Sequence, residues 1–348
     1  MKKKILAAAA AFALALNLVG CTMTTPATVG TIGDVEIPAG LYLLHQYNAY
    51  QDAAALTQDE DVLKATLTLG DGSEHNGADY VAEKTMENLE RYAAVEAKFS
   101  ELNGELSEDE QAYADSQTEG MWASYKDTLE ANGIGKAAVQ AYSENTVKDS
   151  LLVELLYSPE GTEPVADADL WSYMEENFRV GSYVVLPMVN TTDMSMLDED
   201  GQAQMKAIAD AMMAELKDGK AMLDVAKAHL PEALPLIGQE YAEENLPNFV
   251  SQLIYTPSSA ESFGEAVSEG VLASKPGDVK LMQDGAMYMV YQAQDLHTVY
   301  PDLEMLRPTG LMEMKGEELD TMLAESGAAM EHALDAKAMK TYSAKNIK

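Results

Sequence analysis

The period of the hydrophobic pattern changes near residue 179, and this change divides the chain. Just before it, Leu170, Tyr173 and Met174 occupy the i, i+3 and i+4 positions of one helical face. The segment that follows, Arg179–Pro187, is β-branched and aromatic and lacks helical spacing. Such a run predicts a strand that is buried on both faces. The pattern therefore predicts a helical region that leads into a domain of mixed helices and strands.

Upstream of this point the apolar residues mostly follow helical spacing. The pattern predicts a strand–turn–strand over residues 29–37 and a helix that begins at Pro38. Long helices are predicted over residues 78–102, 107–130 and 136–157. In the second of these we expect the following side chains to face inward: Tyr113, Trp122, Tyr125 and Leu129. This part of the chain is thus predicted to form a helical bundle.

Downstream of the predicted strand, helices and short strands alternate. Helices are predicted over residues 202–216, 221–229 and 263–271. We expect a short second strand at residues 234–238 and a closing strand at residues 287–293. Residues 241–259 are interpreted as an irregular loop, and the pattern is helical again from residue 300 onward. This mixture predicts the α+β fold class.

The N-terminus has the features of an export signal. Lys2-Lys3-Lys4 forms a positive region, and residues 5–16 form an apolar core that is too short to span a membrane. Leu18-Val19-Gly20-Cys21 then matches the lipobox of bacterial lipoproteins, in which the cysteine thiol is diacylated. We therefore predict a signal peptide over residues 1–20, lipidation at Cys21 and a tether over residues 21–28. Two acyl chains would hold the protein on the extracytoplasmic face of the cell membrane.

The charge of the chain excludes one class of partner. The sequence has 58 acidic residues against 23 basic ones, a formal net charge of -35. Such a surface repels phosphate backbones, so we expect no binding to nucleic acid. The single cysteine, Cys21, also means that no disulfide forms within the chain.

The motifs of common catalytic and metal sites are missing from the sequence. There is no His-Glu-x-x-His zinc motif, Gly-x-Ser-x-Gly elbow, phosphate loop or dinucleotide fingerprint. The acidic loop at residues 190–201 fails the spacing of a calcium-binding EF-hand loop. His45, near the apolar face of its helix, is interpreted as a packed residue and not as a ligand. We therefore predict neither a metal nor a cofactor.

Residues 165–187 also carry a family resemblance. A helix of the form Val-x-Asp-x-Asp-Leu-x-x-Tyr leads into a strand of β-branched residues, which resembles the opening of the parvulin-type domain of PrsA-like and SurA-like extracytoplasmic foldases. Residues 274–279 resemble a parvulin turn, and residues 29–48 resemble the N-terminal opening of the same foldases.

The resemblance implies a domain plan. Residues 29–164 would form a helical chaperone module like the N-terminal domain of SurA. Residues 165–297 would form an inserted, parvulin-like prolyl isomerase domain. Residues 298–348 would be C-terminal helices that pack on the N-terminal module and complete it.

The resemblance also implies a site in which the usual polar residues are replaced. Active parvulins place one histidine in the first strand and another in the last, whereas here Tyr183 and Met289 occupy these strands. The resemblance implies a third pocket position at Phe263. Tyr183, Met289 and Phe263 are therefore the catalytic candidates. The domain's histidines, His229 and His297, lie outside the predicted strands.

Three functions remain open from the sequence. The resemblance implies a membrane-anchored foldase or chaperone that binds unfolded, newly secreted proteins. The first alternative is a working prolyl cis–trans isomerase with the histidine pair missing. The second alternative is a solute-binding lipoprotein, which requires a cleft between two α/β lobes, although the chain lacks the repeated βα units for it.

Overall fold

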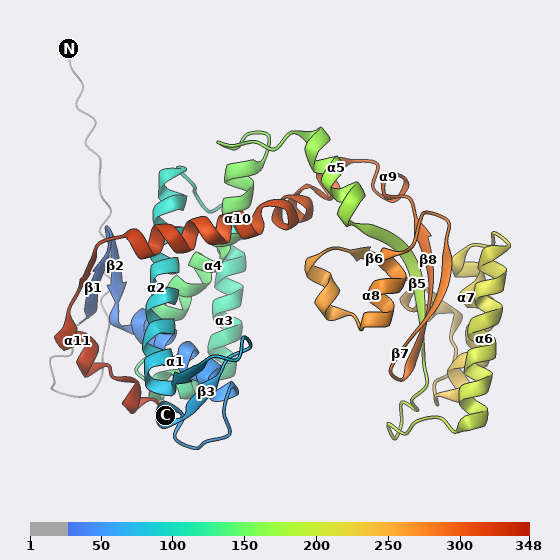
Figure 1. Ribbon diagram of the computed structural model, residues 1–348, viewed down its shortest axis with the longest axis horizontal. Coiled ribbons are helices and arrows are strands. Elements are labelled where there is room, and N and C mark those ends of the chain that lie inside the picture. Colours follow the sequence, from blue (N-terminus) through green and yellow to red (C-terminus); the bar gives the residue numbers. More distant parts are fainter. Residues whose placement is uncertain (1–26) are drawn as a thin grey trace, which may run out of the picture. The chain divides into compact units, whose positions relative to one another are not determined.

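The computed structural model describes residues 27–348 (Figure 1). The predicted signal peptide, Cys21 and most of the tether lie outside the described residues. The chain divides into two compact units. The first unit contains the described residues up to Leu152 together with Leu319–Lys348, and the second unit is Val153–Glu318. The second unit is longer than the predicted domain at residues 165–297, and the functional assignments of these regions stay predictions.

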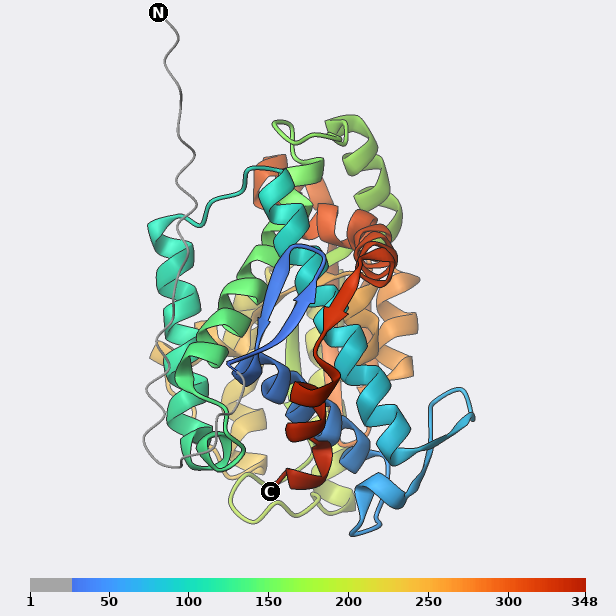
Figure 2. The same cartoon turned by 90° about the vertical axis from the view of Figure 1, so that its left-hand side faces the viewer.

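The first unit joins the beginning and the end of the described chain in one sheet. Strand β1 (Thr28–Ile32) lies between β2 (Val35–Pro38) and β9 (His332–Leu334), and both pairings are antiparallel (Figure 2). Gly30 has a φ of 120° and no side chain, and a Cβ there would overlap the backbone of Ala333. Glycine is therefore required for β9 to approach β1.

Helices make up most of the rest of this unit. They are α1 (Ala39–Ala55), α2 (Gly77–Glu101), α3 (Glu108–Ala131), α4 (Lys136–Tyr157), α10 (Arg307–Ala329) from residue 319 onward, and α11 (Ala336–Thr341). A hairpin of β3 (Thr66–Thr68) and β4 (Glu74–Asn76) precedes α2. The core under the three-stranded sheet includes Ala338 of α11 beside residues of β1 and α2, such as Val29 and Leu89. The predicted long helices are confirmed to within a few residues.

Helix α3 differs from its prediction. Its N-terminus is confirmed, because Ser107 and Glu110 form the capping box that the sequence indicates. Two of the side chains that we expected to face inward, Tyr113 and Tyr125, are instead 59% and 61% exposed. The helix buries a narrow face built from small residues and Leu129, so the tyrosines lie outside the buried face.

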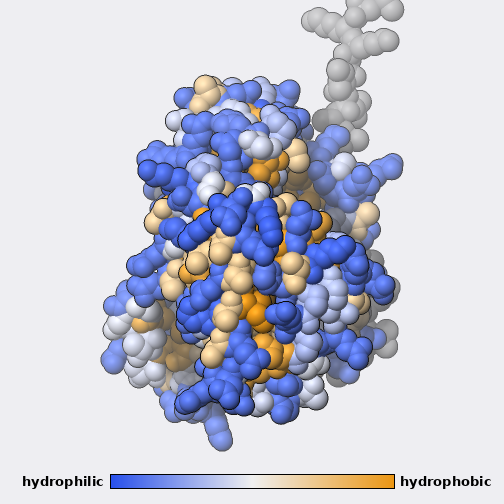
Figure 3. Space-filling view, turned by 90° about the vertical axis from the view of Figure 1, so that its right-hand side faces the viewer, coloured by the Kyte–Doolittle hydropathy of each residue, from blue (hydrophilic) through white to orange (hydrophobic). Residues whose placement is uncertain are grey.

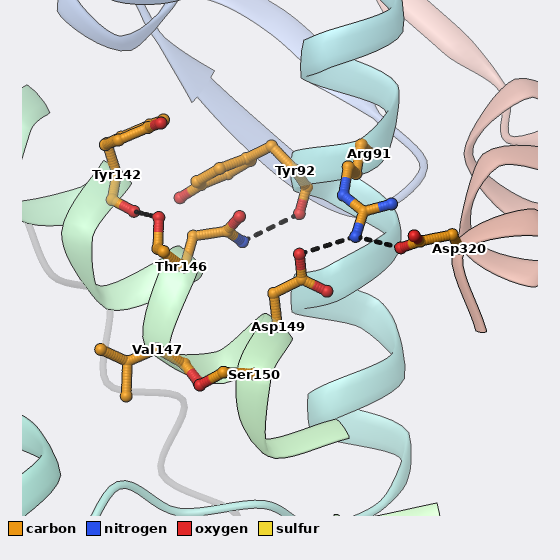
Figure 4. A network of polar contacts seen from close by, with 9 residues as sticks. Arg91, Tyr92, Tyr142, Thr146, Val147, Asp149, Ser150 and Asp320 are labelled. Carbon is orange, nitrogen blue, oxygen red and sulfur yellow. Dashed lines mark hydrogen bonds and ion pairs between the residues drawn. The ribbon is translucent and has the colours of Figure 1, made fainter. Parts of the chain in front are cut away.

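One arginine connects three helices of the first unit (Figure 4). Arg91 of α2 donates from Nη2 to Asp149 of α4 and to Asp320 of α10, each at 2.8 Å. Nearby, the amide of Asn145 on α4 donates to the carbonyl oxygen of Tyr92 at 3.1 Å. These contacts fix the last part of α10 against α2 and α4.

His45 is confirmed as a packed residue. Its side chain is buried between the rings of Tyr92 and Tyr142, at centroid distances of 6.0 and 5.7 Å. Its Nε2 atom has no hydrogen-bond partner in the described part of the chain. Burial lowers the pKa of His45 from 6.5 to about 4, so the imidazole is neutral at pH 7.

The second unit is built on a four-stranded antiparallel sheet with the order β6-β5-β8-β7. The strands are β5 (Arg179–Pro187), β6 (Ser251–Tyr255), β7 (Val279–Asp284) and β8 (Met287–Gln294). Strand β5 lies inside the sheet, with its α6 and α7 face buried and its α8 face only partly covered, whereas its apolar run predicts burial on both faces. All strand pairs of the described residues are antiparallel, whereas the solute-binding alternative requires repeated βα units.

Two helices cover one face of this sheet and a third helix covers the other. Helices α6 (Glu199–Lys217) and α7 (Met222–Leu236) pack on Val184 and Leu186 of β5. Helix α8 (Glu265–Leu272) packs on the opposite face through Val267 and Val271. On the side of α6, hydrophilic residues cover most of the surface and apolar residues show between them (Figure 3).

The remaining helices of this unit pack around α5 (Asp167–Asn177), which precedes β5. Arg307, at the start of α10, donates to Asp167 at 2.9 Å, and Gly310 lets α10 approach Met174 of α5. The short helix α9 (Leu296–Val299) follows β8. Because α10 begins in this unit, the unit extends beyond the end predicted at residue 297.

The predicted second strand was wrong. Residues 234–238 belong mostly to the end of α7, where Leu230, Ala233 and Leu234 continue a buried helical face despite two prolines inside the helix. The second strand is β6, inside the segment that was interpreted as an irregular loop. The short run Ser251–Tyr255 lies between Pro247 and Pro257, and these turn signals hid it.

Candidate functional site

The candidate site lies on the face of the sheet that α8 covers. Residues alternate between the two faces along each strand, so Tyr183 points toward α8 while Val184 points toward α6 and α7. The buried residues of the α8 face form one apolar cluster: Leu253, Tyr255, Val267, Val271, Met282, Met289, Tyr291 and Ala293. Tyr183, Ala260 and Phe263 pack against it and are partly buried.

The structure brings the three catalytic candidates together. Tyr183 on β5, Met289 on β8 and Phe263, just before α8, all belong to this cluster or pack against it. Tyr183 lies opposite Tyr291 in the pairing of β5 with β8, and Met289 lies opposite Val185. Met289 is only 4% exposed, whereas Tyr183 and Phe263 are partly exposed. Their catalytic role stays a prediction.

Tyr291 has a structural role in this cluster. Its hydroxyl donates a hydrogen bond to the carbonyl oxygen of Val180 at 3.0 Å, and its ring lies where a side chain on Gly181 would be. Burial raises the pKa of Tyr291 to about 12, so the hydroxyl stays protonated at neutral pH. The side chain of Tyr291 therefore holds β8 against β5, and its hydroxyl does not act as a base.

Tyr255 is the polar group that the sequence did not reveal. It lies on β6, is 1% exposed, and has a ring centroid 5.8 Å from that of Phe263. Its hydroxyl is buried without a hydrogen-bond partner in residues 27–348. Most buried polar groups are paired, so an unpaired hydroxyl in an apolar cluster is unusual.

The second unit contains no cysteine and two histidines, His229 and His297. His229 lies on α7, which covers the other face, with Nε2 3.4 Å from Glu215. His297 lies on α9, where Nε2 is 2.7 Å from Glu175 and the ring stacks on Trp171 at 4.3 Å. Both histidines lie on helices and not on strands of the sheet, so the cluster offers apolar surface without the histidine pair of active parvulins.

Beyond the cluster, the same face of the sheet continues as a partly exposed apolar strip. We define the apolar strip as Tyr183, Val185 and Pro187 of β5 with Met287 of β8. The β5 residues are partly exposed, and Met287, which lies opposite Pro187, is 41% exposed. Apolar residues at alternate strand positions produce a continuous surface that an extended chain can contact.

Two further features bear on metals and membranes. Within residues 27–348, no three or more His, Cys, Asp or Glu side chains are grouped so that they could hold a metal ion. No helix in that range is both long enough and apolar enough to cross a lipid bilayer.

Comparison with known proteins gives structural matches alone. No family model matches the sequence, and no curated protein matches it. Among solved structures, the chain is similar to the foldase protein PrsA from Streptococcus pneumoniae, with a TM-score of 0.40, 11% identity, and coverage of 80% of this chain and 99% of that one. PrsA from Lactococcus lactis matches with a TM-score of 0.37, 11% identity, and coverage of 92% and 99%. PrsA from Bacillus subtilis matches with a TM-score of 0.32, 12% identity, and coverage of 80% and 98%.

These scores assign the chain to no family. TM-scores of 0.40 and below do not establish a shared fold. The function must therefore be argued from the residues of the site.

Proposed function

We propose that this protein is a foldase-like chaperone that binds newly exported, incompletely folded proteins on the α8 face of its second unit. The observation that carries the proposal is the apolar strip, which leaves Met287 and parts of Tyr183, Val185 and Pro187 exposed. An unfolded chain presents apolar side chains in an extended backbone, and such a strip binds them without requiring a particular sequence. The formal net charge of the chain, -35, favours clients that carry basic residues.

The proposed location follows from the sequence alone. Cleavage before Cys21 and diacylation of its thiol would anchor the chain on the extracytoplasmic face of the membrane. A chaperone at this place would meet clients as they emerge from the export machinery. The inserted, parvulin-like nature of residues 165–297 and the chaperone-like nature of residues 29–164 belong to the same proposal.

The strip is tested by a substitution at its exposed end. Replacing Met287 by glutamate (Met287→Glu) places a charge on the strip, and we expect the protein's suppression of aggregation of several unfolded proteins to fall roughly threefold or more, because burying that charge against a client is costly. Light scattering at equimolar ratio measures the effect. Leu223→Glu is the matched control, because Leu223 on α7 is 46% exposed and lies away from the strip. Equal loss in both variants, or no suppression by the unmodified protein, would contradict the proposal.

A second candidate function is prolyl isomerisation. The observation that favours it is the grouping of Tyr183, Met289 and Phe263 around an apolar cluster that also holds the unpaired hydroxyl of Tyr255. An apolar pocket lowers the barrier of roughly 18–20 kcal/mol by desolvating the imide bond. The cluster has no histidine or cysteine, so the chaperone function is our first choice.

Exchange NMR on a Xaa-Pro peptide separates the two functions. We expect the protein to leave the isomerisation rate at its uncatalysed value, because no histidine pair faces the cluster. Acceleration by the unmodified protein that Phe263→Ala abolishes and Leu223→Ala preserves would reverse the ranking.

A further inference from the structure

Strand β6 is an unpaired edge of the sheet in the second unit. It is hydrogen-bonded to β5 on one side, and the strand order ends with it. In the described part of the chain, no other backbone or side-chain group bonds to the main chain of β6. The outer N–H and C=O groups of this strand are therefore available to a second chain.

The hydrogen bonds of β8 identify which groups point outward. The N–H of Gly277 donates to Ala293 O, and the N–H of Ala293 donates to Asp278 O, both at 2.9 Å. Both main-chain groups of Ala293 therefore point away from β5. Opposite residues of an antiparallel pair either both bond across it or both point away, so the groups of Gly181, opposite Ala293, point toward β6.

The same alternation continues into β6. Gly181 lies opposite Leu253, so the main-chain groups of Leu253 bond to β5. The groups of Gln252 and Ile254, on either side of Leu253, must then project from the free edge. They repeat at roughly 6.8 Å, which is the spacing of two residues in a strand, and the side chain of Gln252 is exposed.

The two edges of the sheet differ in their protection. Strand β7, at the other end, carries Lys280 and Asp284. Strand β6 has the sequence Ser-Gln-Leu-Ile-Tyr, with neither a charge nor a proline. Natural edge strands usually carry one of these features, which prevent pairing with another chain. The absence of both features from β6 indicates an edge that is used for pairing.

Only an extended polypeptide backbone presents alternating donors and acceptors that match such an edge. The charge of the protein restricts that polypeptide further. Glu243 and Glu244 lie in the 3₁₀ helix just before β6, and the whole chain has a formal charge of -35. A segment with basic residues is therefore favoured over an acidic one.

We propose that the free edge of β6 binds an extended, basic segment of a client protein by adding it to the sheet as a fifth strand. This proposal rests on the proposed chaperone function and names the mode in which clients bind. Main-chain hydrogen bonds supply affinity that does not depend on the client's side chains, and the charge of the client supplies the preference.

The test uses the full chain and a fluorescein-labelled peptide of ten residues that alternates valine and threonine between terminal lysines. Gln252→Pro removes one outward N–H and preserves the bonds to β5, as an edge strand tolerates. We expect this substitution to weaken peptide binding roughly tenfold, measured by fluorescence anisotropy, with the thermal midpoint unchanged. We expect the same loss when the peptide is N-methylated at alternate residues along one edge, a change that does not touch the protein's own fold.

Gln283→Pro is the matched control at the other edge. The main-chain groups of Ala293 point toward β7, and those of Tyr291 and Met289 do the same because the direction alternates along the strand. Lys280 lies opposite Tyr291 and Met282 lies opposite Met289, so the main-chain groups of Lys280 and Met282 bond to β8. The N–H of exposed Gln283 therefore also points outward, and we expect Gln283→Pro to bind the peptide normally.

If the peptide binds, four outcomes would overturn this assignment. They are unchanged binding by Gln252→Pro, an equal loss in Gln283→Pro, unchanged binding of the N-methylated peptide, and self-association of the unmodified chain that Gln252→Pro abolishes, since the edge would then pair two copies. If the peptide fails to bind while aggregation is still suppressed, strand addition is wrong and the chaperone function stands. If the protein neither binds the peptide nor suppresses aggregation, both strand addition and the proposed chaperone function are wrong.

Discussion

Replacing Gly181 by valine is expected to lower the free energy of unfolding of the second unit by about 3 kcal/mol or more, because overpacking strains a well-packed core. Gly181 lies on β5, and a Cβ there would overlap both the ring of Tyr291 and the carbonyl oxygen of Gln292. The ring would have to leave the position from which its hydroxyl reaches Val180. The pairing of β5 with β8 would be lost with it.

Urea unfolding followed by the fluorescence of Trp171 measures this effect. Trp171 lies in the second unit and Trp122 in the first, so Trp122→Phe leaves a signal from the second unit alone. Gln252→Val is a suitable control, because Gln252 lies on the same sheet with an exposed side chain. An unfolding midpoint in Gly181→Val equal to that of the unmodified protein would show that the sheet accommodates the side chain.

The first unit is expected to lose stability as the pH falls below 6.5. Burial lowers the pKa of His45 to about 4 in the folded protein, against 6.5 in the unfolded chain. Between these values the unfolded state binds a proton that the folded state does not, so acidification favours unfolding. The contribution of His45 is fully present above pH 6.5 and is lost progressively toward pH 4. Its full size is roughly 3 kcal/mol.

The pH dependence is measured by urea unfolding between pH 7 and pH 5, followed by Trp122 in a Trp171→Phe background. His45→Leu is expected to flatten the profile in this window, because leucine does not titrate. His75→Gln, in the hairpin of the same unit, is the control variant. An unchanged slope in His45→Leu would mean that other groups cause it.

Long periodic segments of this chain were predictable from the sequence. Helix α4 matches its predicted bounds, and β5 and β8 were found from continuous apolar runs. Strand β6 was missed because it has only five residues, which are too few to show a period, and because a proline lies on either side of it. The exposed Tyr113 and Tyr125 were misplaced because α3 buries mostly small side chains, which the hydrophobic pattern does not weigh.

Only part of the candidate site could be predicted from the sequence. Tyr183, Met289 and Phe263 were singled out by a resemblance, and the structure places all of them on one face. Tyr255 could not be found, since its role depends on β6, which was interpreted as loop. The importance of Gly181 could not be predicted either. Glycine is needed there because the ring of Tyr291, more than a hundred residues later in the sequence, occupies the space of a side chain.

The pairing of β1 with β9 has a consequence for the order of folding. About three hundred residues separate these strands, so the first unit cannot complete its sheet until nearly all of the chain has emerged on the side of the membrane where it folds. Residues 153–318 are continuous and contain every strand of their own sheet. A domain of this kind can fold as soon as its last strand emerges, whereas contacts of high sequence separation form slowly. The second unit should therefore reach its native fold before β9 pairs with β1.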